Sequence, residues 1–150
     1  MNIIEVLSNL DSLFVDTAPI IYYIEAHETF GPLTKEVISF FQAEKRPIFT
    51  SVITVTEVLP VPVSLNNEEP AKKFVSFLKK GKNINLLEIS SSIAEHAGRL
   101  RGKYNSLRTM DALQVASAVY AGADAFLTND VRLKQVKEEI DVIVMRDYVE

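Results

Sequence analysis

Short apolar runs alternate along this chain with longer segments in which apolar residues recur every three or four positions. The short runs predict buried strands at residues 13–15, 48–52, 84–89, 125–128 and 142–144. The longer segments predict helices at residues 20–25, 33–41, 55–59, 71–80, 93–104, 110–121 and 131–138. Strands that alternate with helices form parallel sheets covered on both faces. The pattern therefore predicts an α/β fold with a mostly parallel sheet of four to five strands.

Polar residues and glycines mark the predicted helix ends. Ser92 and Glu95 form a capping-box pattern at the start of one helix, and Thr109 is suited to cap the next. Gly81 and Gly122 each follow a helix, where a glycine in the left-handed conformation commonly ends it.

Residues 60–70, PVPVSLNNEEP, are the most loop-like part of the chain because three prolines interrupt the helical pattern. The segment is too short and too apolar for a linker between domains. We therefore expect residues 1–150 to form a single domain.

Composition narrows the classes of function. The 16 basic and 20 acidic residues give a net charge of −4, which argues against a polycation that coats nucleic acid or acidic membranes. Because the chain has no cysteine, disulfides, thiolate metal sites and cysteine nucleophiles are excluded. The first residues lack the basic region of a signal peptide, and no apolar run approaches the roughly 20 residues of a membrane span. These features predict a cytoplasmic protein without membrane contact.

Four acidic residues are expected at one edge of the sheet. Asp16 directly follows the first strand, Glu57 lies just after the second, and Asp130 follows the fourth by two residues. Asp111 begins a helix that only residues 122–124 separate from the fourth strand, so helix and strand must run antiparallel. A helix of about twelve residues is ~18 Å long, comparable to the strand and its link, which returns Asp111 to the same edge.

Such a cluster predicts a divalent cation. Carboxylates within ~4–6 Å of each other raise one another's pKa and destabilise the fold if all stay ionised. Oxygen ligands alone suit Mg²⁺ or Mn²⁺ better than zinc. A carboxylate-bound ion of this kind activates water and neutralises a transferring phosphodiester, so the cluster indicates a metal-dependent phosphate-ester enzyme such as a nuclease.

Three segments resemble the sequence blocks of PIN (PilT N-terminus) domains: FVDTAPIIYYIE, SVITVTEVL and DALQVASAVYAGADAFLTND. They are most similar to the toxin nucleases of VapBC toxin–antitoxin systems, in the same order, and the resemblance extends from residue 13 to about residue 144. It implies a three-layer α/β/α fold. It also implies a metal site whose acids match four positions of this chain, Asp16, Glu57, Asp111 and Asp130.

The resemblance assigns supporting roles and shows one departure. Thr17 stands where the family often has a small hydroxyl residue, and Thr128 where it has Thr or Ser as polar support of the acids. Many relatives have Asn and an aliphatic residue where this chain has Ala18 and Pro19. That difference leaves the acids in place but bears on the shape of the first helix and the groove beside it.

The implied function is that of an endoribonuclease that cuts RNA with metal-activated water. The resemblance further implies a cognate antitoxin, which lays an apolar helix in a groove, and a homodimer. Residues 58–65 and the helix with Tyr22 and Tyr23 are candidates for that groove. Arg99, Arg101 and Arg108 lie in a stretch without acids that leads to the metal site, and they are candidate contacts to the RNA backbone.

Each acid also has a purely structural interpretation. Asp16 and Asp130 are suited to cap helices, the helix dipole favours Asp111 in a first turn, and Glu57 fits a solvent-facing helix position. The basic residues likewise fit an ordinary solvated helix face. A PIN-like module that binds RNA or protein without cutting is therefore the alternative function.

Two other classes with acids at a parallel-sheet edge fit less well. A phospho-acceptor receiver domain expects paired acids after the first strand and an Asp at the end of the third, where this chain has Asp16 alone and Glu88-Ile89-Ser90. A hydrolase with an aspartyl nucleophile expects a second acid two residues after Asp16, where Ala18 stands.

Overall fold

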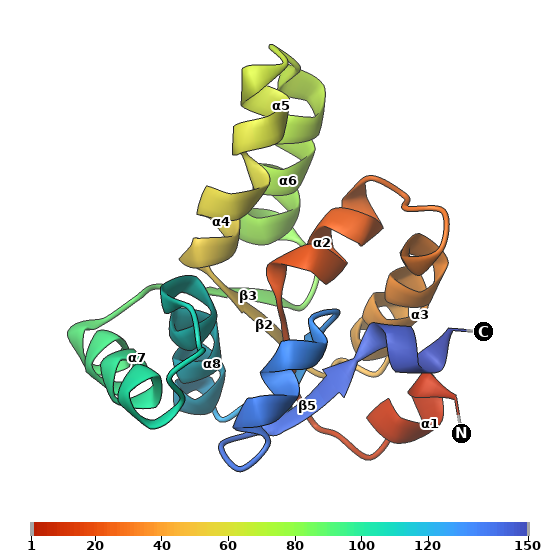
Figure 1. Ribbon diagram of the computed structural model, residues 1–150. Coiled ribbons are helices and arrows are strands. Elements are labelled where there is room, and N and C mark those ends of the chain that lie inside the picture. The colour runs from red at the N-terminus through yellow and green to blue at the C-terminus, as the bar shows by residue number, and fades with distance from the viewer. Residues whose placement is uncertain (1, 150) are drawn as a thin grey trace.

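A computed structural model describes residues 2–149, which contain one parallel sheet of five strands (Figure 1). The strands are β1 (Leu13–Val15), β2 (Ile48–Ser51), β3 (Ile84–Leu87), β4 (Ala125–Thr128) and β5 (Asp141–Val144). Their order across the sheet is β3-β2-β1-β4-β5, and every neighbouring pair is parallel. All five predicted strands are confirmed, and each ends within two residues of its predicted end.

Helices cover both faces of the sheet (Figure 1). The α-helices are α1 (Ile3–Leu7), α2 (Thr17–Ile24), α3 (Phe30–Ala43), α4 (Val52–Val58), α5 (Pro60–Ser64), α6 (Glu68–Lys80), α7 (Ser91–Lys103) and α8 (Thr109–Ala121). Two 3-10 helices follow, η1 (Val131–Val136) and η2 (Met145–Tyr148). Helices α1, α2, α3 and α6 share a core with one face, and α7, α8 and η1 share a core with the other. The predicted three-layer α/β/α fold is therefore confirmed.

Alternation along the central strands assigns side chains to the two cores. Leu13 and Val15 of β1 point into one core and Phe14 into the other, as expected for a strand buried on both faces. Phe14 stacks on Phe126 of β4 with ring centroids 5.2 Å apart. These contacts lock β1 beside β4, and that placement brings the polar residues after the two strands together.

The segment predicted as a loop begins with a helix. Residues 60–64 form α5, because Pro60 occupies the first helical position, where no intrahelical hydrogen bond from its nitrogen is needed. Pro62 falls within the same first turn and is buried. The following helix α6 starts at Glu68, three residues before the predicted start. Together α5 and the start of α6 project beyond the rest of the fold (Figure 1).

Some helix ends differ from the sequence prediction. Ser90, not Ser92, caps α7, since its hydroxyl accepts a hydrogen bond from the backbone N–H of Ile93. Thr109 is the first residue of α8 and not its cap. Gly122 has the predicted left-handed conformation, with φ of 73°. Within residues 2–149, none of the helices combines the length and apolar character that crossing a bilayer requires.

Candidate active site

The topology places a crevice where β1 and β4 end. The chain leaves β1 toward β2 and leaves β4 in the opposite direction, toward β5, so the strand order reverses between these two neighbours. In open α/β sheets, ligands bind beyond the carboxyl ends of the strands at such a reversal. Asp16 directly follows β1, and Asp130 follows β4 by two residues.

One cleft of about 520 Å³ at this edge is lined by all four predicted acids, Asp16, Glu57, Asp111 and Asp130. The antiparallel packing of α8 against β4 returns Asp111 to the edge, as the topology argument requires. Thr17, Thr128 and Arg108 line the same cleft. Arg99 and Arg101 do not line it and lie on α7, where Arg99 pairs with Glu95.

Asp16 is the buried carboxylate of the site. As the residue before α2, it accepts a hydrogen bond from the Thr17 backbone N–H at 2.9 Å on one oxygen. Thr128 donates its hydroxyl proton to the other oxygen at 2.8 Å. Burial nevertheless raises the pKa of Asp16 to about 6, since both hydrogen bonds lower it by less, and the charges of Asp111 and Glu57 raise it further.

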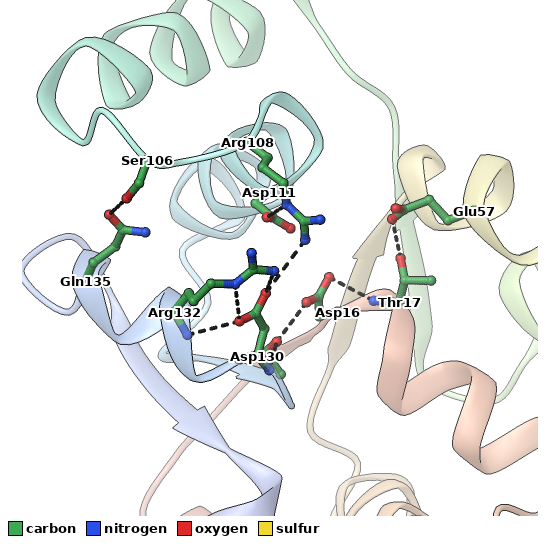
Figure 2. Close-up of polar contacts among 10 residues, drawn as sticks. Asp16, Thr17, Glu57, Ser106, Arg108, Asp111, Asp130, Arg132 and Gln135 are labelled. Carbon is green, nitrogen blue, oxygen red and sulfur yellow. Dashed lines mark hydrogen bonds and ion pairs between the residues drawn. The ribbon is translucent and has the colours of Figure 1, made fainter.

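Glu57 projects from α4 toward the start of α2 (Figure 2). The Thr17 hydroxyl donates to Glu57 Oε1 at 2.7 Å and lies 3.0 Å from the Thr54 hydroxyl. Because the Thr17 proton points to Glu57, Thr54 is the donor of the second contact. Thr17 and Thr128, which the sequence predicts as polar support, therefore each hold one acid of the cleft.

Beneath the acids lies a network of buried polar side chains. Gln114 donates to Thr54 at 2.9 Å and accepts from Ser51 at 2.5 Å, and Thr50 lies 3.0 Å from Thr54. The network joins β2, α4 and α8 and leaves none of the buried side-chain polar atoms in residues 2–149 without a hydrogen bond. Sequence reasoning missed Gln114, although a glutamine three residues after Asp111 shares its helix face in an alanine-rich helix.

Two arginines pair with the acids on the opposite side of the cleft (Figure 2). Arg132 of η1 binds both oxygens of Asp130, at 3.0 and 2.7 Å. Arg108 donates to Asp111 at 2.9 Å and lies 3.7 Å from Asp130. The Arg132 guanidinium is the main cause that lowers the pKa of Asp130 below its usual value. Arg132 was not predicted, because the sequence alone does not show that η1 folds back over Asp130.

The chemistry of the site fits a hard divalent cation. Every candidate ligand is a carboxylate oxygen, and the four acids come from α2, α4, α8 and the start of η1. As the side chains stand, no three acids or histidines in residues 2–149 are grouped to hold a metal ion. In this arrangement the Asp111 and Asp130 carboxylates are paired with the guanidinium groups of Arg108 and Arg132. A bound cation would therefore have to displace them from these oxygens.

Comparison with known proteins bears on the family and the fold of this chain. The sequence profile of the PIN domain family matches residues 13–139. No curated protein sequence gives a significant match to this chain.

Several solved structures share the fold. VapBC2 from Rickettsia felis, bound to a DNA fragment from its promoter, superposes with a TM-score of 0.72 at 18% identity, over 89% of this chain and 98% of that one. A toxin–antitoxin complex from Klebsiella pneumoniae superposes with a TM-score of 0.64 at 22% identity, over 88% of this chain and 96% of that one. FitAcB from Neisseria gonorrhoeae superposes with a TM-score of 0.65 at 15% identity, over 87% of this chain and 96% of that one.

Proposed function

This chain belongs to the PIN domain family, and on that premise we propose that it is a Mg²⁺- or Mn²⁺-dependent endoribonuclease that acts as the toxin of a toxin–antitoxin pair. The observation that carries the proposal is the cleft at the strand-order reversal, which carboxylates from four elements line together. The toxin–antitoxin complexes among the structural neighbours support the toxin role.

Asp16, Asp111 and Asp130 are the proposed metal ligands, with Glu57 completing the set. The oxygen-only donors fit Mg²⁺ or Mn²⁺, and the raised pKa of Asp16 marks a carboxylate that lacks a compensating charge. When bound, the cation supplies an activated water and charge neutralisation at the phosphodiester.

The residues of the chain hold the reacting groups in place. Thr128 and the backbone N–H of Thr17 fix both oxygens of Asp16, and the Thr17 hydroxyl fixes Glu57. Glu57 is exposed at the cleft and in position to orient the attacking water. Attack of a water oxygen on phosphorus would form one P–O bond and break the P–O bond to a ribose, whose leaving oxygen would take up a proton released by the water.

Cleavage of a mixed transfer and ribosomal RNA pool tests the proposal, with Mn²⁺, with Mg²⁺ and with EDTA. We expect discrete, metal-dependent fragments that are lost in Asp111→Asn. The matched control is Asp141→Asn, which changes an exposed acid at the opposite end of the sheet. A folded protein that neither cleaves RNA nor binds Mn²⁺ would contradict the proposal and favour the non-catalytic binding module.

The proposed antitoxin needs an apolar groove. One of about 550 Å³ lies between α5 and α6, with Leu59, Val63, Ala71 and Val75 among its lining residues. Val61, Val63 and Leu65 are 64%, 52% and 69% exposed, so three large apolar side chains lie at the surface within five residues. The groove includes part of the segment 58–65 predicted from sequence, so we assign it to an apolar helix of the antitoxin.

Co-expression of this chain with a candidate antitoxin that carries an apolar helix tests this partner. We expect a complex with the wild type that Val63→Asp weakens, whereas Tyr120→Phe, on the exposed face of α8, leaves it intact.

Light scattering of the purified chain alone tests the proposed homodimer. A chain that is monomeric at all concentrations, or a complex insensitive to Val63→Asp, would contradict the respective assignment.

A further inference from the structure

One arginine of the cleft differs from the other two in its partners. Arg146 of η2 lines the cleft with Arg108 and Arg132. Those two are paired with carboxylates, whereas among residues 2–149 no carboxylate lies within ion-pair distance of Arg146. Instead its backbone N–H and its Nε–H both donate to the side-chain oxygen of Asn129, at 3.0 and 3.2 Å. The two terminal nitrogens of this guanidinium are left for an anion.

Asn129 connects this arginine to a tyrosine. The Asn129 side chain is only 4% exposed, and its Nδ2 donates to the Tyr22 hydroxyl oxygen at 3.1 Å. The two Arg146 donors fix which end of the amide is oxygen, so its nitrogen must face Tyr22. The Tyr22 oxygen therefore accepts, and its own proton has no acceptor within the part of the chain that the structure describes.

The tyrosine ring is held in place by its neighbours. Tyr22 stacks on Phe30, with centroids 5.0 Å apart, and lies 4.8 Å from the ring of His27. It lines the same cleft as Arg146 and the four acids. The buried Asn129 amide thus orients two groups that still have donors to offer, the Tyr22 O–H and the Arg146 guanidinium, at one side of the acidic cleft.

We propose that Tyr22 and Arg146 bind a backbone phosphate of single-stranded RNA, next to the phosphate that is cut, and that Asn129 is the residue that positions both. This inference rests on the proposed nuclease function, since it assigns a substrate contact at the same cleft. Two donors without acceptors suit an anion, and a planar guanidinium suits phosphate. Asn129 precedes Asp130 in the chain, which places this phosphate beside the acids.

The acidic cleft also explains why an unpaired cation is needed. The charges of Arg108 and Arg132 are already balanced by Asp111 and Asp130, so they add little net attraction for RNA in this state. Arg146 is the rim cation whose charge the neighbouring acids do not balance. An RNA strand held there would meet the acids from the η2 side.

Binding without cleavage tests the inference directly. Fluorescence anisotropy of a labelled single-stranded RNA in EDTA, at several salt concentrations, measures affinity and its salt dependence. We expect Arg146→Ala to weaken binding about tenfold and to reduce the slope of log affinity against log salt by about 0.7, because one phosphate contact is lost. Arg146→Lys should retain the slope, and Tyr22→Phe should weaken binding about threefold with the slope unchanged.

Matched controls are Lys35→Ala, which removes an exposed cation on α3 away from the cleft, and Tyr120→Phe. Affinity and slope in Arg146→Ala equal to those of Lys35→Ala would overturn the inference. In the cleavage assay, the inference expects Arg146→Ala to raise KM more than it lowers kcat. An active enzyme with unchanged KM in Arg146→Ala would contradict the phosphate contact and leave the nuclease proposal intact. The expected binding losses in a protein whose wild type neither cleaves RNA nor binds Mn²⁺ would support the contact and contradict the nuclease proposal.

Discussion

Asp16 is the most buried of the four acids in the cleft. Its carboxyl group is buried, and its pKa of about 6 lies above the value of 3.8 for an exposed aspartate. In the folded protein the carboxyl therefore holds its proton to higher pH than it does in the unfolded chain. Ionising it in the fold is costly, and carboxyl groups with pKa values raised in this way are common at functional sites.

The pH dependence of stability follows from this shift. Between about pH 4 and pH 6 the folded state binds the proton and the unfolded state does not, so this contribution is fully present below pH 4 and is lost as pH rises through 6. A shift from 3.8 to about 6 corresponds to roughly 3 kcal/mol. We therefore expect Asp16→Asn to be more stable than wild type at pH 8 in EDTA by up to that amount, and not at pH 4.

Urea unfolding at several pH values measures the difference between the two proteins. Asp141→Asn, which changes an exposed acid, serves as the control and should follow the wild type. A constant difference between wild type and Asp16→Asn from pH 4 to pH 8 would show that Asp16 is not the group that titrates.

Arg132 leads to a second prediction at this scale. Its fork on Asp130 is solvent-exposed, with 64% of the arginine side chain accessible, and exposed pairs contribute about 0.2–1 kcal/mol. If the proposed metal binds Asp130, it must displace this guanidinium. We expect Arg132→Gln to raise Mn²⁺ affinity about two- to fivefold in isothermal titration calorimetry. Unchanged or weaker Mn²⁺ binding would mean that Arg132 does not compete with a cation.

Among the elements, the turn after α6 shows where sequence patterns mislead. Gly81 was predicted to end the helix in the left-handed conformation, but its φ is −61°, which any residue adopts. Glycine is required at this position because a larger residue lacks room: a Cβ there would lie 2.5 Å from the carbonyl oxygen of Phe77 and 2.8 Å from Ile84 Cγ1. Close approach to the Phe77 carbonyl of α6 and to Ile84 of β3, and not backbone conformation, requires the glycine.

Alanine at this glycine should therefore destabilise the fold. We expect Gly81→Ala to lower the free energy of unfolding by about 1–3 kcal/mol, as for overpacked sites. The matched control is Gly98→Ala within α7, where a Cβ meets nothing within 4 Å and helix propensity predicts a gain of about 1 kcal/mol. Equal effects in urea unfolding would contradict the steric explanation.

Short apolar runs predicted the strands, and the positions of the acids after these runs predicted the sheet edge at which they gather. Both features depend only on residues that are close together in the sequence. Asp16 and Asp130 each follow a strand directly or within two residues, so topology alone brings them together. The partners of these acids were not predictable in the same way. The contacts of Gln114 and Arg146 depend on how distant elements pack, which no local pattern encodes.

At the scale of the whole molecule, the four acids belong to two different layers. Asp16 and Glu57 come from α2 and α4, whose buried residues pack in one core, whereas Asp111 and Asp130 come from α8 and the start of η1, which pack in the other. The carboxyl ends of the neighbouring parallel strands β2, β1 and β4 lie side by side at this edge. The cleft is therefore where the two helical layers meet beyond the sheet. A cation held by acids of both layers would join them.

That joining makes a prediction about stability. A ligand at one hundred times its dissociation constant stabilises the folded state by about 2.7 kcal/mol. We expect Mn²⁺ at that level to raise the melting temperature by roughly 5–10 °C in the wild type, and much less in Asp16→Asn or in Asp111→Asn, because each variant removes a ligand from a different layer. Asp141→Asn should respond like the wild type.

Hydrogen exchange distinguishes a joint between layers from binding to one side. If the cation joins them, amide exchange should slow both at the start of α2 and at the start of α8, because opening either helix end then requires release of the metal. Slowing confined to α8 and η1 would place the ion on Asp111 and Asp130 alone. In that case Asp16 would keep its raised pKa with the metal bound, and its pH-dependent loss of stability would persist in Mn²⁺.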